Sequence, residues 1–356
     1  MIVLDGSHGG QILRTALALS AISCVPFRIE NIRAGRDNPG LKAQHLTAIK
    51  AVQKLCSAVV EGAELGSASL TFYPKLLKGG NIELDVGTAG SVTLVLQAAI
   101  LPALFGLRQT RFLITGGTDV PFSPPIDYFT EVFVPHIRMW CEQVSVRVLK
   151  RGYFPVGQGM VEVIVKPKVY RDDYATFEQF LDALRASVPA IENMQLGHPV
   201  LINGVSHASL EGVAERQAHA AQQTLVKRGD VHIRAENVKS ASPGSGITLW
   251  ALYSLTPDEL EISRPIRLGA SALVEKSIAA EVVGKKAALE LLDLIDAGAP
   301  VDVHLADQLV PLLGLRGGQY RTSLISEHTK TNIAVVNQFV PEVKAEGMVV
   351  KKSQLT

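Results

Sequence analysis

A strand, a glycine-bearing turn and an apolar helix follow one another twice in the first third of this chain. Residues 1–4 are apolar and lead into Asp5-Gly6-Ser7-His8-Gly9-Gly10, after which the spacing of apolar residues predicts a helix. The same order recurs in a strand over 81–86, the turn Gly87-Thr88-Ala89-Gly90-Ser91 and an apolar helix over 92–104. The residue identities differ between the copies, so the architecture is repeated and the sequence is not. We expect an α/β (α+β) protein whose core consists of repeated βα modules with layers of sheet and helix.

The pattern changes after Pro167, where polar residues precede a new series of elements. The predicted elements are strands at 200–203, 231–235 and 247–254, a helix at 210–227 and one long helix at 271–296. This block is large enough to form a smaller α/β domain. We therefore expect a core formed by residues 1–169 and 298–356, with an inserted domain at 170–297.

Three further segments carry specific predictions. Residues 70–73 and 81–86 are expected to pair as strands around a glycine turn, and the helix at 127–140 to be kinked or split by Pro135. The apolar run Thr331-Asn332-Ile333-Ala334-Val335-Val336 is predicted to be a buried strand with His328 at its mouth. An imidazole in that position suggests chemistry, although one histidine alone is weak support.

Composition limits the location of the protein and the kind of partner. The formal net charge is +1, so a nucleic acid would have to bind a local basic patch. The three cysteines have no metal-binding spacing, and their odd number fits a reduced cytoplasmic compartment. The most apolar window, 94–107, contains Gln97 and Pro102 and is too short to cross a bilayer. We expect a cytoplasmic protein with no membrane partner.

Basic residues beside two glycine-bearing segments suggest anion binding. A turn that opens a helix offers free backbone N–H groups, and Arg14 falls in the first turn of such a helix, where a cation opposes the helix dipole unless an anion is bound. The alternative is that Arg14 points to solvent. Arg33 and Arg36 flank a glycine in a loop and could grip a phosphate, although a solvated charged loop is the commoner interpretation.

Several polar residues are predicted on the apolar sides of helices. His45, with Gln44 beside it, fits either a core histidine satisfied by hydrogen bonds or a ligand contact. Gln97, in the middle of an apolar helix, needs partners and either bridges helices or contacts a ligand. Asp307, followed by Gln308, lies near the start of an apolar helix, where it could orient an imidazole, bind a metal or simply favour the helix start.

Taken together, the motifs resemble those of the RNA 3'-terminal phosphate cyclase family. The matching stretches occur in the right order along nearly the whole chain, which makes the set far more specific than any single glycine motif. They are residues 9–14, 32–36, 39–41, 44–48, 59–67, 87–91, 94–97, 116–119, 304–308 and 331–336.

The resemblance implies the fold, the reaction and the roles of individual residues. The family has a core of repeated βα units with a smaller inserted domain, and it uses ATP with a divalent metal, Mg or Mn, to convert an RNA 3'-phosphate to a 2',3'-cyclic phosphate. By this resemblance His328 is the nucleophile that takes AMP from ATP, Arg14 neutralises phosphate and Asp307 orients His328. The implied ATP-binding residues are Gln97, His304, Leu305, Ala306, Asp307 and Gln308, and the implied RNA phosphate-binding residues are Arg33, Arg36, Gln44 and His45.

The chain departs from the family in its first motif. Asp5-Gly6-Ser7-His8 runs directly into Gly9-Gly10, whereas the family has an acidic residue among the glycines there, near the metal and the catalytic histidine. No metal ligands are therefore assigned. The expected partner is an RNA 3'-phosphate end, and a homodimer is a further expectation.

Two other functions fit parts of the sequence. The first is the cyclase-like, non-catalytic branch that binds RNA in ribosome assembly, against which the presence of His328 argues and for which the missing acidic residue argues mildly. The second is a transferase of the enolpyruvyl type, which has a similarly modular α/β core but would need other basic residues and no histidine nucleophile.

Overall fold

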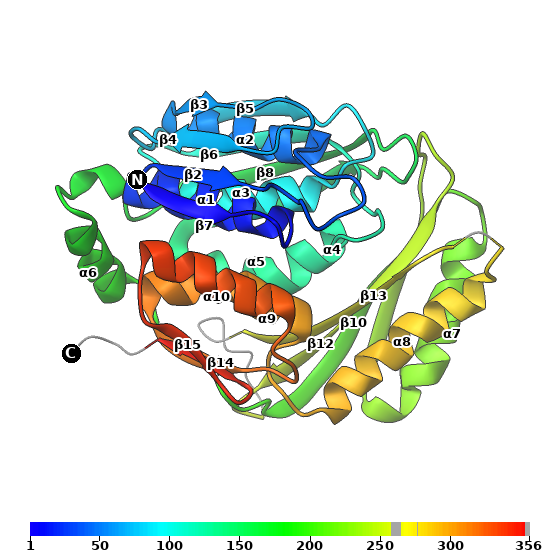
Figure 1. Ribbon diagram of the computed structural model, residues 1–356. Coiled ribbons are helices and arrows are strands. Elements are labelled where there is room, and N and C mark those ends of the chain that lie inside the picture. Colours follow the sequence, from blue (N-terminus) through cyan, green and yellow to red (C-terminus); the bar gives the residue numbers. More distant parts are fainter. Residues whose placement is uncertain (258–264, 276, 353–356) are drawn as a thin grey trace.

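The computed structural model describes residues 1–257, 265–275 and 277–352, which form a core of three βαβαββ modules and one inserted domain (Figure 1). The first module contains β1 (Ile2–Asp5), α1 (Gly10–Ser23), β2 (Phe27–Glu30), α2 (Ala43–Cys56), β3 (Val59–Glu61) and β4 (Leu70–Tyr73). The second contains β5 (Gly80–Asp85), α3 (Val92–Ala103), β6 (Thr110–Gly116), α4 (Ile126–Tyr128), a π-helix (Phe129–Phe133), α5 (Val134–Ile137), a 3-10 helix (Arg138–Trp140), β7 (Cys141–Lys150) and β8 (Gly159–Pro167). The third contains β9 (Ile191–Asn193), α9 (Val303–Arg316), β14 (Gly318–Arg321), α10 (Glu327–Phe339), β15 (Val343–Glu346) and β16 (Val349–Lys352).

The three modules share one sheet topology. In each sheet the strands lie in the spatial order first, second, fourth, third: β1-β2-β4-β3, β5-β6-β8-β7 and β9-β14-β16-β15. The first two strands of each sheet are parallel and the remaining pairs are antiparallel. The predicted α/β core of repeated βα modules is confirmed, and the third copy extends the repetition to the C-terminal part of the chain.

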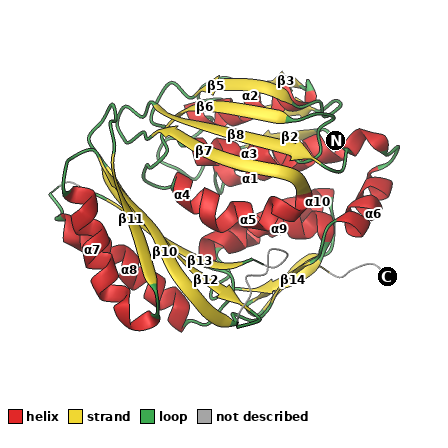
Figure 2. Cartoon of the chain, turned by 180° about the vertical axis from the view of Figure 1, so that it is seen from behind, coloured by secondary structure: helices red, strands yellow, loops and turns green. Residues whose placement is uncertain are grey.

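The inserted domain interrupts the third module between β9 and α9. It contains β10 (His198–Ala208), α7 (Val213–Leu225), β11 (Val231–Asn237), β12 (Ser245–Ser254), β13 (Ile266–Leu273) and α8 (Ala280–Asp296), with a 3-10 turn (Val226–Arg228) after α7. Its sheet has the order β11-β10-β12-β13, and α7 and α8 cover the face that points away from the core (Figure 2). Since β9 pairs with β14, we place the inserted domain at 198–296, a narrower range than 170–297. Before β9, a 3-10 helix (Arg171–Asp173) and α6 (Phe177–Ser187) complete the fold.

Burial explains why these segments take these forms. β6 alternates buried and partly buried residues along its length, as expected for a strand with one covered face. α3 is apolar on nearly every side because it is packed inside the core, and Leu94 and Gln97 are its partly exposed residues. One apolar cluster joins all three modules and also takes Val205, Trp250 and Leu252 from the inserted sheet. The inserted domain has a second cluster between its sheet and its two helices.

Several predictions about individual elements are wrong. Residues 331–336 are helical, because Ser326 caps α10 by accepting the Thr329 N–H, and Asn332 and Val336 then fall on the buried side of that helix. The segment 271–296 is not one helix, since it divides into the end of β13 and α8. Strands β4 and β5 do not pair and belong to different sheets.

The helix at 127–140 is split as predicted: the π-helical turn ends at Phe133, and Pro135 is the second residue of the following helix α5. In the part of the chain that the structure describes, no helix is both long and apolar enough to cross a bilayer.

Candidate functional site

The amino-terminal turns of α1, α9 and α10 meet at one side chain. Gln11, the second residue of α1, donates from Nε2 to the backbone oxygen of His328 at 2.9 Å and to Oδ1 of Asp307. Gln11 is almost fully buried, so these two bonds fix where its amide points. The beginning of the first module is thereby joined to both helices that carry the predicted catalytic residues of the third.

The Asp307 carboxylate accepts hydrogen bonds from two amides. Besides Gln11, Asn332 donates from Nδ2 to Oδ1 and to the backbone oxygen of Asp307, the latter at 2.9 Å. Thr15 donates to Oδ1 of Asn332 at 2.6 Å, which fixes the orientation of that amide. Burial raises the pKa of Asp307 to about 6, although the positive charge of Arg14 opposes the rise.

Arg14 faces a small cavity beside this network. It lies in the second turn of α1, not the first, and it does not point to bulk solvent. Burial lowers the pKa of Arg14 to about 10, while Asp307 acts in the opposite direction. The cavity, about 40 Å³, is lined by Gln11, Arg14, Thr15, Gln97, Phe133, Asp307, Gln308, Pro311 and Asn332. Arg14 lines this cavity, and an anion placed there would neutralise its charge.

His328 is the second residue of α10 and is exposed. Partial desolvation lowers its pKa, and the charges of Arg14, Arg36 and His304 act in the same direction. A lowered pKa increases the fraction of neutral imidazole at neutral pH, and the neutral ring is the nucleophilic form. The charges that act on this ring come from α1, α9 and the loop after β2.

The loop after β2 and the first turn of α2 lie against the glycine turn that precedes α1. A Cβ on Gly9 would lie 3.8 Å from Nη2 of Arg36, and a Cβ on Gly10 would lie 2.2 Å from Nε2 of His45. The glycine turn therefore lies close to both the arginine loop and α2. Gln44 accepts the backbone N–H of Ser91 at 3.0 Å, which ties α2 to the start of α3.

His45 is buried, as its predicted place on the apolar side of the helix implied, and its ring is fixed at one end. Its Nδ1 accepts the backbone N–H of Lys42 at 2.9 Å, so the neutral ring carries its proton on Nε2. Burial lowers the pKa of His45 to about 3, helped by the charges of Arg14 and Arg33. The ring is neutral at physiological pH and presents an Nε2–H donor toward the glycine turn. Arg33 lies close to it with a left-handed φ of 56°, and burial, then Arg36, lowers the pKa of Arg33.

The predicted ATP-binding residues have different environments. Gln97 and Gln308 line the cavity, and His304 is exposed on the first turn of α9. Leu305 and Ala306 are fully buried, so their side chains pack in the core and support α9 from inside.

Among the described residues, no hydrogen bond joins the Asp307 carboxylate to the His328 ring. The link between them runs through Gln11. Gln11, Thr15 and Asn332 were not assigned roles from the sequence. The signal was a polar residue at a buried helical position, as with Asn332 beside Val335 and Val336.

Among the described residues near His328, no three His, Cys, Asp or Glu side chains come together as possible metal ligands. Within the described ranges, a group of three possible metal ligands occurs at Asp119, Asp127 and His207, under the inserted sheet and not in the cleft. There the Arg151 guanidinium donates to both carboxylates, at 3.3 and 2.7 Å, and so already supplies positive charge. In the cleft, the Asp307 oxygen Oδ1 is used by two amides.

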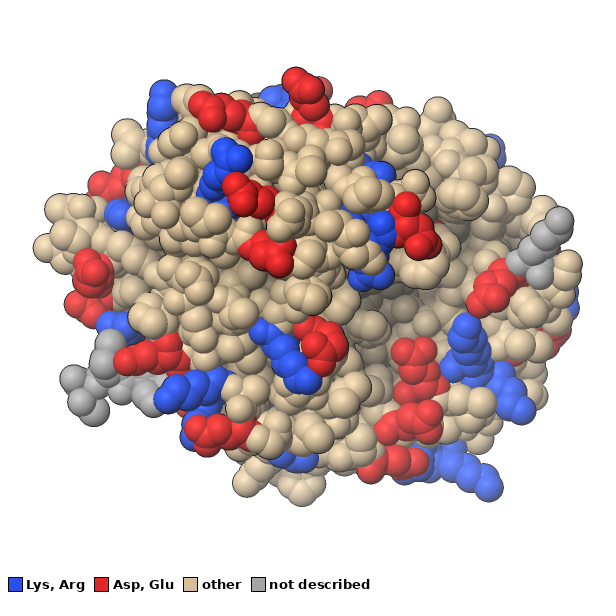
Figure 3. Space-filling model, viewed as in Figure 1, with Lys and Arg blue, Asp and Glu red and all other residues tan. Residues whose placement is uncertain are grey.

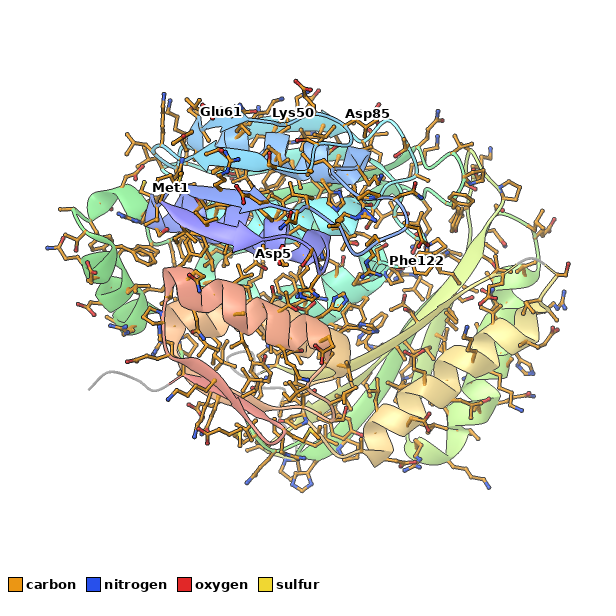
Figure 4. The ribbon with its side chains drawn as sticks, viewed as in Figure 1. Met1, Asp5, Lys50, Glu61, Asp85 and Phe122 are labelled. Atoms are coloured by element: carbon orange, nitrogen blue, oxygen red, sulfur yellow. The ribbon has the colours of Figure 1, made fainter. Side chains whose placement is uncertain are left out.

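The surface is hollowed where the core faces the inserted domain. Figure 3 shows this hollow near the centre of the view, with basic side chains bordering it on the core side. Figure 4 places Asp5, at the end of β1, on the side of the first module that faces α10, and Phe122, in the loop before α4, on the side of the core that faces the inserted sheet. Phe122 is fully exposed with a left-handed φ of 64°.

Comparison with known proteins gives a consistent result. The family model described as RNA 3'-terminal phosphate cyclase matches residues 5–344. A protein of Pyrococcus furiosus named RNA 3'-terminal phosphate cyclase is 43% identical, with 100% of this chain and 98% of the relative covered. Proteins of the same name from Archaeoglobus fulgidus and Thermococcus onnurineus are each 42% identical, with 98% of this chain and 98% and 96% of the relatives covered. With a match over almost its entire length, the chain belongs to the RNA 3'-terminal phosphate cyclase family.

Proposed function

We propose that this protein is an ATP-dependent RNA 3'-terminal phosphate cyclase and that His328 carries the transferred AMP. The observation that supports this most strongly is that Gln11, Arg14 and Asp307, from distant parts of the sequence, line one cavity, and that Gln11 also bonds the backbone oxygen of His328. A neutral imidazole with basic neighbours is a competent acceptor of a phosphoryl group, since such transfers depend mainly on positioning and charge.

The proposed reaction has three steps. The free ring nitrogen of His328 forms a bond to the α-phosphorus of ATP, and the bond to pyrophosphate breaks. An oxygen of the RNA 3'-phosphate then attacks the same phosphorus, and the bond to His328 breaks, which leaves an RNA-adenylate. Finally the neighbouring 2'-OH attacks the activated 3'-phosphate, loses its proton and expels AMP, which leaves the 2',3'-cyclic phosphate.

The residues divide between the two substrates. Arg14 would neutralise charge on the phosphates of ATP, with Gln97 and Gln308 of the cavity and the exposed His304 shaping the nucleotide site. Asp307 would orient the nucleophile indirectly, because its bond to Gln11 fixes the amide that contacts the His328 backbone.

On the opposite wall, Arg33, Arg36, Gln44 and the neutral His45 would contact the RNA 3'-phosphate. A Mg²⁺ or Mn²⁺ ion would reach the cleft on the triphosphate, since the side chains described beside His328 do not provide a ligand set.

Labelling with ATP that carries a radioactive α-phosphate tests this assignment. Wild-type protein is expected to retain label that is stable in alkali and lost in acid, and His328→Ala to retain none. His219→Ala, which removes an exposed histidine on α7 bonded to Gln223, is the matched control and should label normally. Label on His328→Ala would show that another residue is the nucleophile.

The same assay separates the alternatives. A non-catalytic RNA-binding protein, which the missing acidic residue in the first motif favours, would bind RNA 3'-phosphate ends without acquiring label. An enolpyruvyl transferase would neither label nor bind such RNA, although its modular core would look similar.

A further inference from the structure

We propose that Asp302 is a positioning residue through which the inserted domain fixes the ATP-facing start of α9. This inference rests on the proposed function, because it concerns how the nucleotide side of that site is built. Asp302 is the cap of α9 and is only 1% exposed. It precedes His304 and Asp307 on the same helix, so a movement of Asp302 would move both.

Four donors share the Asp302 carboxylate. Oδ1 accepts the backbone N–H groups of His304 at 3.0 Å and Leu305 at 2.9 Å, together with the hydroxyl of Tyr128 at 2.6 Å. Oδ2 accepts the backbone N–H of Gly269 at 3.1 Å. A buried carboxylate with four donors is satisfied, and each donor restricts where it can lie.

The donors come from three parts of the fold. His304 and Leu305 belong to α9 in the third module, Tyr128 to α4 in the second module, and Gly269 to β13 in the inserted domain. The approach of β13 requires glycine, because a Cβ at 269 would lie 2.5 Å from Cε2 of Tyr128. The inserted strand is therefore pressed against the tyrosine that also contacts the carboxylate.

The contacts of Asp302 and Tyr128 reach the proposed nucleotide site through His304. The Tyr128 and His304 rings lie edge to face, with centroids 6.2 Å apart and planes at 88°. Tyr128 thus contacts α9 twice, through Asp302 and through His304. The hydrogen bond from Gly269 of the inserted domain thus fixes the start of α9, and with it the positions from which His304 and Asp307 would contact the nucleotide.

Asp302→Asn tests the hydrogen bond from Gly269 separately from the bonds that cap α9. The amide can keep its oxygen toward His304, Leu305 and Tyr128, and its NH₂ group then faces the Gly269 N–H, so donor opposes donor. The helix cap survives while the bond to the inserted domain is lost. We expect the Kd for ATP, measured by equilibrium binding, and the KM for ATP in adenylylation to rise about tenfold, because small displacements of binding groups are costly. The KM for RNA should stay within twofold.

Arg267→Gln is the matched control on the same strand. Arg267 donates from Nη1 to the backbone oxygen of Glu131 at 2.7 Å and to its Oε2 at 3.3 Å, so this change also removes an inserted-domain contact with the core but does not involve α9. It should lower Tm to a similar extent while leaving the Kd for ATP within twofold. A rise in the Kd for ATP equal to that of Asp302→Asn would mean that general loosening of the interface, and not Asp302, is responsible.

Further outcomes are equally decisive. An Asp302→Asn protein that binds ATP like wild type overturns the inference, whatever its stability. If Asp302→Asn does not fold, Tyr128→Phe removes one donor only, and the Kd for ATP should rise about threefold; no rise would overturn the inference. If wild-type protein binds ATP but never takes label, the proposed function fails, while the binding comparison still decides the role of Asp302.

Discussion

Asp307→Asn should make the protein more stable at neutral pH while lowering its proposed activity. Burial raises the pKa of Asp307 from 3.8 to about 6. The folded protein therefore holds this proton more tightly than the unfolded chain does, and stability falls as the pH rises through that interval. At 1.36 kcal/mol per pKa unit, keeping this carboxylate charged costs about 3 kcal/mol at pH 7.

The substitution preserves the contacts of the favoured state. An asparagine oxygen at 307 can still accept from Gln11 and Asn332, and no negative charge has to be buried at this position. For a chain of 356 residues, about 3 kcal/mol corresponds to a rise in Tm of roughly 4 °C at pH 7. Near pH 4, where Asp307 is already protonated, the two proteins should differ by less than about 1 kcal/mol. Adenylylation should fall, because Arg14 loses its anionic neighbour.

Calorimetry from about pH 4 to pH 7.5 measures this effect directly. Asp293→Asn, which removes an exposed carboxylate on α8, is the control and should stay within about 0.5 kcal/mol of wild type throughout. The reasoning would be refuted by an Asp307→Asn protein that is less stable than wild type at pH 7, or by a difference in stability that does not change with pH.

Two other changes test the packing around the cleft and beneath the inserted sheet. Gly10→Ala places a methyl group 2.2 Å from the fixed His45 ring, so urea unfolding should show a loss of about 1–3 kcal/mol and the KM for RNA should rise; unchanged stability would mean that α1 and α2 separate freely. Arg151→Met leaves the buried Asp119 and Asp127 without their guanidinium and should cost about 3–5 kcal/mol at pH 7. Burial raises the pKa of Asp119, and the charges of His207 and Arg151 oppose that rise. Without Arg151 the carboxylate takes up a proton at a higher pH, so that loss should shrink toward pH 4, and a loss that stays constant would contradict the ion-pair explanation.

The sequence was most informative where pattern and local chemistry agreed. The first two modules could be predicted because a glycine turn separates a short apolar strand from an apolar helix in each. The third module was harder to recognise, since the inserted domain separates β9 from α9 by more than a hundred residues. The run after His328 was misassigned because Ile333, Val335 and Val336 favour strands by propensity. The Ser326 cap and the buried spacing of Thr329, Asn332 and Val336 are helical signals that outweigh propensity.

The individual contacts of the candidate site could not be predicted from such local patterns. Arg14 and His328 could be proposed as partners only from the family resemblance, since nothing local to either residue indicates that α1 lies beside α10. Gln11 is a plain polar residue at a helix start, and its function as a bridge depends on a tertiary contact with Asp307. Asp302 fits an ordinary helix cap in sequence, and its contact with Gly269 follows only from the position of the inserted sheet.

The location of the cleft follows from the repeated topology. Gln11, Gln44, His304 and His328 are each the second residue of a helix, in α1, α2, α9 and α10 respectively. Helix starts carry unpaired N–H groups and the positive end of the helix dipole, so a point where several of them meet attracts anions before any charged side chain is added. Arg14 then adds a guanidinium, and the Asp307 carboxylate that acts on it is already bonded by two amides. This arrangement suits two phosphate-bearing substrates placed on either side of one imidazole, and it requires that the three modules, rather than any single motif, create the site.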